Sequence, residues 1–216
     1  MMHVKTFCFN QMDENCHLIW DNADGTAVVV DPGCATAAER EALQAFIAAE
    51  GLRPAAALLT HLHFDHLAGS GWLRERYGID CYVHEADRDL EKLLQETAHV
   101  YDFRMELPVG PFRYFAPEER ELRFGAVTVR ILPLGGHTRG SVAYYFPDAG
   151  AVCVGDTVRK GTLGFLETGF APVLEALRDY LLPLPEDTRM LPGHGEASTL
   201  GEERRENRFF RRSLAL

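Results

Sequence analysis

Residues 60–66 read Thr60-His61-Leu62-His63-Phe64-Asp65-His66, and they contain four potential metal ligands. This stretch lies between an apolar run at 55–59, which predicts a strand, and a helical pattern that begins near Leu67. In an extended segment, side chains two positions apart project to the same side, so His61 and His63 can hold one metal ion. Asp65 and His66 lie where the chain turns into the helix, and they can reach a neighbouring ion.

Taken singly, each of these residues has a simpler interpretation. Asp65 alone would be read as a helix N-cap, and a lone histidine as a polar residue at the end of a strand. Taken together, those interpretations would require several clustered imidazoles with no partner. Neutral imidazole and carboxylate are the usual ligands of zinc and similar ions, so the cluster favours a metal site.

Three further segments place a histidine or an aspartate directly after an apolar strand pattern. Gly135-Gly136-His137 follows one predicted strand, Gly155-Asp156 ends a second, and Gly193-His194-Gly195 follows a third. Glycine lets the backbone bend sharply and lets an ion or a substrate approach. An aspartate at a strand end often only caps a turn, but Asp156 completes a ligand set.

The rest of the chain alternates strand and helix patterns, which is typical of sheets covered by helices. No short-period repeat or linker interrupts it, so two similar halves packed sheet to sheet would explain it. The expected strands are residues 4–9, 17–20, 27–30, 55–59, 81–83, 127–132, 142–146, 151–154 and 189–191. The expected helices are residues 35–50, 67–77, 85–95 and 172–182, with a final helix near the C-terminus.

The series HxHxDH, GGH, GD and GHG, in this order and spacing, resembles the metallo-β-lactamase superfamily over essentially the whole chain. The resemblance implies an α/β (α+β) fold, a four-layer αββα sandwich, in a single domain of residues 1–216. It also implies two divalent metal ions, with zinc favoured over iron or manganese. The first ion would be bound by His61, His63 and His137, the second by Asp65, His66 and His194, and Asp156 would bridge them.

Within that superfamily, the motifs look like the glyoxalase II-like branch, whose members hydrolyse thioesters such as hydroxyacylglutathione. The segments Asn15-Cys16-His17-Leu18-Ile19, Val30-Asp31-Pro32-Gly33 and Gly155-Asp156-Thr157 carry this likeness. The commonest antibiotic-degrading β-lactamases have a cysteine at the position of Asp156 and are exported, so we do not expect β-lactam hydrolysis. Phe165 stands where many glyoxalase II-like sequences carry an arginine. The sequence also ends at Leu216, without the helical C-terminal domain of glyoxalase II.

The expected function is therefore metal-dependent hydrolysis, in which a metal-bridging hydroxide cleaves a thioester or ester, hydroxyacylglutathione-like or smaller. Asp65 is the expected catalytic residue, because it can orient the hydroxide and take up its proton. Two alternatives on the same fold are a lactonase and a persulfide dioxygenase that uses a single iron. A third is a degenerate, non-catalytic binding protein, although such proteins typically lose ligands.

Four residues outside the ligand set are candidates by position. Thr138 and Arg139 follow His137 directly, and with Phe165 they are expected to contact the substrate. Asp31 closes the strand at 27–30 and is expected to fix a ligand histidine. Simple turn chemistry in Asp31-Pro32-Gly33 explains Asp31 equally well.

Composition narrows the partners. The net charge of −10 argues against nucleic acid, whose affinity rests on lysine and arginine. No signal peptide or membrane-spanning run is found, and five scattered cysteines fit a reducing compartment, so we expect a cytoplasmic protein with a small-molecule acyl substrate. Residues 96–121 are expected to form a long irregular insertion, either a lid or an aromatic-rich loop packed against the domain. The sequence leaves the oligomeric state open.

Overall fold

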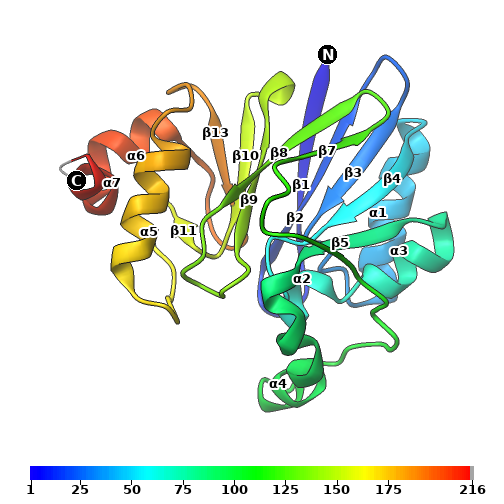
Figure 1. Ribbon diagram of the computed structural model, residues 1–216. Coiled ribbons are helices and arrows are strands. Elements are labelled where there is room, and N and C mark those ends of the chain that lie inside the picture. Colours follow the sequence, from blue (N-terminus) through cyan, green and yellow to red (C-terminus); the bar gives the residue numbers. More distant parts are fainter. Residues whose placement is uncertain (215–216) are drawn as a thin grey trace.

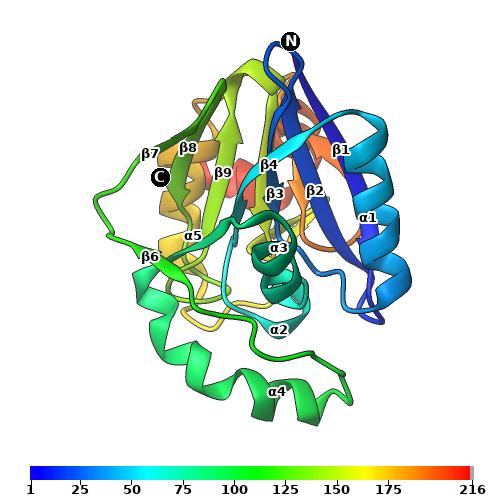
Figure 2. The same ribbon diagram turned by 90° about the vertical axis from the view of Figure 1, so that its right-hand side faces the viewer.

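Four layers make up the protein, which is described here by a computed structural model covering residues 1–214 (Figure 1). Two six-stranded sheets face each other in the middle, and helices cover the outer face of each sheet. The turned view shows α1 and α3 on the near side, and α5 behind the second sheet (Figure 2). The expected αββα sandwich is confirmed.

The first sheet has the order β1-β2-β3-β4-β5-β6. Its first three strands pair antiparallel, and β3 to β6 pair parallel. The strands are β1 Met2–Phe9, β2 Glu14–Asp21, β3 Thr26–Val30, β4 Arg53–Leu58, β5 Asp80–His84 and β6 Arg113–Phe115. The accompanying helices are α1 Ala37–Ala49, α2 Phe64–Leu67, α3 Ser70–Tyr77, the 3₁₀ helix η1 Glu85–Leu93 and α4 Leu94–Val100.

The second sheet has the order β14-β13-β10-β9-β8-β7, in which only β10 and β13 pair parallel. Its strands are β7 Glu121–Phe124, β8 Val127–Pro133, β9 Val142–Phe146, β10 Ala151–Gly155, β13 Arg189–Pro192 and β14 Ser198–Thr199. A separate hairpin joins β11 Val158–Arg159 and β12 Thr162–Leu163. The helices are η2 Pro147–Ala149, α5 Phe170–Ala176, the π-helical turn η3 Leu177–Leu181, α6 Leu200–Glu206 and α7 Arg208–Ser213.

Strand β3 shows why the central strands are apolar without alternation. All five of its residues are buried, because one face meets the other sheet and the opposite face meets helices. Val28 and Val30 join the core between the sheets, with Tyr144 and Phe146 of β9. Ala27 and Val29 point the other way, into the core that includes Leu43 of α1.

The prediction of an irregular stretch at 96–121 is partly wrong. Its first residues belong to α4, which continues η1, and Arg113–Phe115 form β6 at the edge of the first sheet. The predicted helix at 172–182 is divided into α5 and η3, and the final helix is interrupted at Asn207, whose side chain caps α7. Within residues 1–214, no helix is long and apolar enough to cross a membrane.

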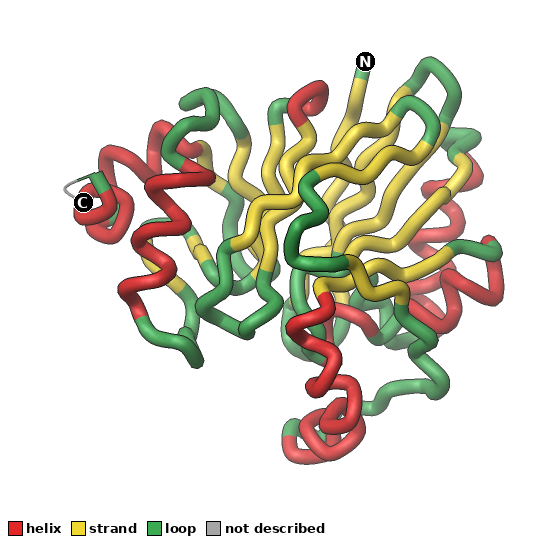
Figure 3. The backbone as a smooth tube through the Cα atoms, viewed as in Figure 1, coloured by secondary structure: helices red, strands yellow, loops and turns green. Residues whose placement is uncertain are grey.

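The loops that follow β3, β4, β10 and β13 meet at one edge of the sandwich, which is the lower edge in Figure 1 near α2. Loops after parallel neighbouring strands share an edge, and ligands of α/β sheets are commonly bound there. The tube view shows the same edge as green loop segments below the strands, with red helical segments between them (Figure 3). All seven predicted metal ligands lie on this edge.

Candidate metal centre

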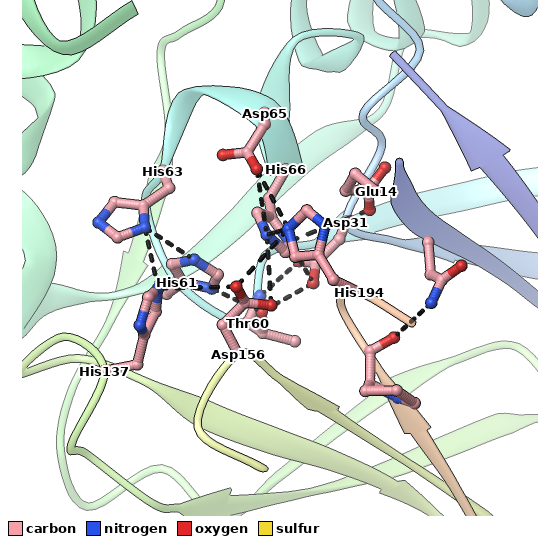
Figure 4. Close-up of polar contacts among 12 residues, drawn as sticks. Glu14, Asp31, Thr60, His61, His63, Asp65, His66, His137, Asp156 and His194 are labelled. Carbon is pink, nitrogen blue, oxygen red and sulfur yellow. Dashed lines mark hydrogen bonds and ion pairs between the residues drawn. The ribbon is translucent and has the colours of Figure 1, made fainter. Parts of the chain in front are cut away.

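Three histidines form the first ligand cluster, at the left of the close-up (Figure 4). Nδ1 of His63 lies 3.1 Å from Nε2 of His61 and 3.0 Å from Nε2 of His137. His61 and His63 follow β4, whereas His137 comes from the loop after β8 in the other sheet. One potential ligand atom from each residue lies within 4.8 Å of the others, a spacing that can hold one metal ion.

The second cluster lies beside the first and contains Asp65, His66 and His194 (Figure 4). Nε2 of His194 is 3.2 Å from both Nε2 of His66 and Oδ2 of Asp65. The short helix α2 carries Asp65 and His66, and the loop after β13 carries His194. This group also combines donors from both halves of the sandwich.

Asp156 directly follows β10 and lies between the two clusters (Figure 4). Its Oδ1 is 3.7 Å from Nε2 of His66, and its Oδ2 is 4.0 Å from Nε2 of His137. Oδ1 is buried and has no hydrogen-bond partner among the described residues. A buried carboxylate oxygen without a partner is costly, and a cation on either side would satisfy it.

The hydrogen bonds on the outer nitrogens fix the protonation of the histidines. Nδ1 of His137 donates to the Phe165 carbonyl over 2.8 Å, and Nδ1 of His194 donates to the Met12 carbonyl over 2.9 Å. Nδ1 of His66 donates to Asp31 over 3.1 Å. In neutral imidazoles, the Nε2 atoms that face the centre must then be acceptors.

The outer nitrogen of His61, Nδ1, also donates a hydrogen bond, and its acceptor is a hydroxyl oxygen. Thr60 donates its hydroxyl proton to Asp31 over 2.7 Å, so its oxygen accepts from Nδ1 of His61 over 3.0 Å. Nitrogen lone pairs therefore converge on each cluster, and they repel one another unless a cation lies among them. The residues present fit two divalent ions.

Electrostatics agree with this arrangement. Burial lowers the pKa of His63 to about 4, with help from His137, so this ligand is neutral at physiological pH. Burial would also lower the pKa of His66, but Asp65, Asp31 and Asp156 outweigh it and raise the value to about 10. The second cluster thus favours positive charge strongly enough to hold a proton, and a metal ion supplies that charge in its place.

Gly193 is required for this packing. A Cβ atom there would lie 2.4 Å from Oδ1 of Asp156 and 2.5 Å from Cε1 of His66, closer than any side chain tolerates. The prediction that glycines beside the ligands allow close approach therefore holds at this position, and the group that approaches is part of the ligand set itself.

Sequence comparison agrees with this geometry, because the pattern of the "Metallo-beta-lactamase superfamily" matches residues 10–194. The chain belongs to the metallo-beta-lactamase superfamily. Membership supports a metal-dependent hydrolase, and the fold implies that the chain binds divalent metal.

Three relatives illustrate the range of the superfamily. Hydroxyacylglutathione hydrolase GloC of Haemophilus influenzae is 30% identical over 96% of this chain and 98% of its own. The crystal structure of BLEG-1 B3 metallo-beta-lactamase is 29% identical with a TM-score of 0.84, and the match covers 96% of this chain and 99% of that one. The crystal structure of TTHA1623 in a di-iron-bound form is 33% identical with a TM-score of 0.80, and the match covers 95% and 99%.

Asp31 lies where the sequence placed it, behind the ligands. Its two oxygens accept hydrogen bonds from the backbone and hydroxyl of Thr60 and from Nδ1 of His66. A contact of this kind fixes the orientation of a ligand imidazole and raises its basicity. Asp31 therefore contacts the predicted ligand His66, and its role in positioning that ligand stays a prediction.

The three expected substrate contacts differ in their positions. Phe165 is 76% exposed and lines the pocket above the centre. Thr138 is fully buried, its hydroxyl donates to Asp87 over 2.8 Å, and it is not among the residues that line the pocket. Arg139 is exposed and is not among the residues that line this pocket. Thr138 and Arg139 follow His137 in the sequence, but neither of them is among the residues that line the pocket.

Asp87 on η1 is a positioning residue that the sequence did not reveal. It is 1% exposed, and its Oδ2 accepts from Thr138 and from the backbone of Leu62, while Oδ1 accepts from the backbone of Gly140. Leu62 separates His61 from His63, and Thr138 follows His137. One carboxylate therefore joins the two loops that supply the first cluster.

Replacing Asp87 with alanine is expected to weaken metal binding at the first cluster about 10- to 100-fold, the usual effect of removing a group that orients ligands. Competition with a chromophoric chelator measures this affinity. Asp89→Ala on the same helix is the matched control, because Asp89 is exposed and pairs with Lys92. Equal metal affinity in the two variants would show that Asp87 does not position the ligands.

A second residue missed from the sequence is Glu14, at the start of β2. It is fully buried, and its Oε1 lies 4.0 Å from Nδ1 of His66. Burial, together with Asp31 and Asp65, raises the pKa of Glu14 well above its usual range. Glu14 lies behind the second cluster, on the side of His66 that faces away from the pocket.

A pocket of about 530 Å³ opens above the metal centre. Ligand residues form its floor, and its walls combine apolar and charged side chains. The walls are Met12, Phe64, Thr97, Tyr101, Arg159, Phe165 and Glu167. Thr97 and Tyr101 show that the segment beginning at 96 reaches the pocket, and its role as a lid stays a prediction.

Proposed function

We propose that this protein hydrolyses a thioester or ester with a two-metal centre. The observation that carries the proposal is the pair of three-residue donor groups on either side of Asp156, each with its ligand atoms within 4.8 Å. His61, His63 and His137 would hold one ion, and Asp65, His66 and His194 the other. Asp156 would serve both.

The chemistry divides between the ions and the chain. When bound, two divalent ions lower the pKa of water and polarise an acyl carbonyl. Asp65 lines the pocket, and its carboxylate would hold the attacking water and accept its proton. Water and the thioester give a carboxylic acid and a thiol, so no oxidant is needed. No cysteine or serine lines this pocket within the described residues, which supports attack by water.

Zinc is the metal we propose, because neutral imidazole and carboxylate suit it. Iron and manganese accept the same ligands, and selection among them depends on geometry and supply. The di-iron form of TTHA1623 supports two ions on this framework and makes iron the first alternative to test.

A thioester is favoured as the substrate by the likeness to a hydroxyacylglutathione hydrolase. The pocket offers a partly apolar wall that includes Phe64 and Phe165, which suits an acyl group or an uncharged thiol. S-lactoylglutathione is one candidate, and a smaller thioester is the other.

The test compares four substrates on protein loaded with zinc or with iron: S-lactoylglutathione, an acyl-homoserine lactone, the β-lactam nitrocefin, and glutathione persulfide with oxygen uptake. Protein treated with a chelator is the control. The proposal predicts that thioester or lactone hydrolysis exceeds nitrocefin hydrolysis and requires two ions. Oxygen consumption with one iron would replace the hydrolase by a dioxygenase, and inactivity in every metal form would favour a non-catalytic protein.

A further inference from the structure

Among the described residues that line the pocket above the metal centre, Arg159 is the one arginine or lysine. This residue ends β11, and its strand pairs with β12 so that Arg159 faces Thr162 in the register. The other charged wall residue is Glu167, and the floor carries Asp65 and Asp156. A lone guanidinium among carboxylates marks the place where an anionic ligand group can bind.

The guanidinium is held in position and is still available for binding. Nη2 of Arg159 donates to Oδ2 of Asp156 over 2.9 Å, which is its only hydrogen bond within residues 1–214. The side chain is 44% exposed. Guanidinium presents several N–H donors in a planar fork, so donors remain for a second acceptor on the pocket side.

The contact with Asp156 also fixes how far Arg159 lies from the two ligand clusters. Oδ2 of Asp156 lies 3.6 Å from Nε2 of His194 and 4.0 Å from Nε2 of His137. Arg159 is therefore one hydrogen bond away from the carboxylate between the two clusters. An anion bound by Arg159 would lie a few ångströms from the reacting acyl group, which limits it to a short substrate.

The neighbouring cation has a different environment. Lys160 pairs with Glu196 over 2.7 Å and is not among the residues that line the pocket. Phe165, which lies where the resemblance predicted a cation, is also on the pocket wall. The positive charge that position 165 lacks is thus present in the same pocket on β11, whereas Phe165 lies two residues after the end of β12.

We propose that Arg159 binds a carboxylate of the substrate, so that the preferred substrates are short thioesters or esters that carry a carboxylate near the scissile bond. This inference rests on the proposed hydrolase function. A planar guanidinium and a carboxylate match in shape and charge, and such charged hydrogen bonds are stronger than neutral ones. The carboxylate belongs either to the acyl part or to the leaving thiol, and the experiment distinguishes these.

The experiment uses three thioesters, with uncatalysed hydrolysis subtracted. Succinyl and pentanoyl thioesters of N-acetylcysteamine differ in the acyl carboxylate, and the acetyl thioester of 3-mercaptopropionate carries it on the thiol. One carboxylated substrate is expected to exceed pentanoyl about 10- to 100-fold in kcat/KM. A preference for the succinyl thioester would show that Arg159 binds the acyl part of the substrate. A preference for the acetyl thioester of 3-mercaptopropionate would show that it binds the leaving thiol.

Variants assign that preference to a residue. Arg159→Ala should reduce the ratio between the carboxylated and uncharged substrates to about one, and Arg159→Lys should retain part of it. Lys160→Ala, which removes the adjacent cation, should leave the ratio unchanged. If Arg159→Ala slows both substrates equally, Arg159 acts only on Asp156 and the inference is overturned. No preference in the unmodified protein would overturn it as well.

Measurements of binding test the anion site at Arg159 independently of the hydrolase function. Thioether analogues of the succinyl and pentanoyl substrates cannot be hydrolysed, and calorimetry on metal-loaded protein measures their affinities. Tighter binding of the carboxylated analogue, lost in Arg159→Ala, would support the anion site even if no thioester is turned over. Equal affinities would refute the anion site, whatever the protein hydrolyses.

Discussion

Replacing Asp65 with alanine is expected to lower kcat for the preferred thioester about 10²- to 10⁴-fold, the range for losing a group that transfers a proton. Asp65 is 6% exposed, lines the pocket, and has its Oδ2 3.2 Å from Nε2 of His194. His66 and His194 counter the effect of burial and hold the pKa of Asp65 far below its usual range, so it is a carboxylate at neutral pH. Steady-state kinetics on the metal-loaded variant measures this loss.

The control for Asp65 is the isosteric variant Asp65→Asn. Asparagine keeps an acceptor oxygen for a metal ion, but it cannot take up a proton at neutral pH. Asp65→Asn should therefore retain more metal than Asp65→Ala and remain nearly as slow. Turnover within a few-fold of the unmodified protein in both variants would exclude a catalytic role for Asp65.

Replacing Asp156 with alanine is expected to have a larger effect, at least about 10³-fold in kcat/KM, because it removes both a ligand and a charge at the centre. It should also reduce the metal content from two ions per chain to one or fewer. Elemental analysis after dialysis measures the content, and far-ultraviolet circular dichroism checks that the variant is folded. Asp148→Ala, on the exposed η2 turn, serves as a surface control.

Two full equivalents of metal in Asp156→Ala would contradict the shared position assigned to this carboxylate. The geometry predicts otherwise, since His66, His194 and His137 all have Nε2 atoms within 4.0 Å of an Asp156 oxygen. The metal content and kcat/KM of Asp156→Asn should fall between those of Asp156→Ala and the unmodified protein, because the amide keeps one acceptor oxygen and loses the negative charge.

The convergence of the predicted ligands on one edge could be expected because these residues follow strand patterns directly. His61 and His63 come after an unmistakable apolar run, and the glycines around His137 and His194 mark sharp turns. Strand ends and turns are local features, so a single sequence reveals them. Asp31 was predictable for the same reason, as it closes β3.

The residues that were missed depend on contacts distant in the sequence. Asp87 lies in a charged helical segment, where an acidic residue is normally solvated, and its partners Leu62 and Gly140 are 25 and 53 residues away. The contact of the buried Thr138 hydroxyl with that same carboxylate joins residues that are 51 positions apart. No local pattern marks either role.

Local patterns also failed between residues 96 and 121. Strand β6 has three residues, Arg113–Phe115, too few for an alternating pattern to stand out. It is a strand because β5 offers a free parallel edge, with Val83 opposite Tyr114. The pairing is a tertiary effect that the segment itself does not encode.

The most direct test of the two-metal centre is elemental analysis of the purified protein, combined with thioester turnover during stepwise metal addition to the metal-free protein. Our account predicts two ions per chain at full activity, and one ion with little activity in His194→Ala, which lacks a donor of the second cluster. One ion per chain at full activity, or full activity in the metal-free protein, would contradict it.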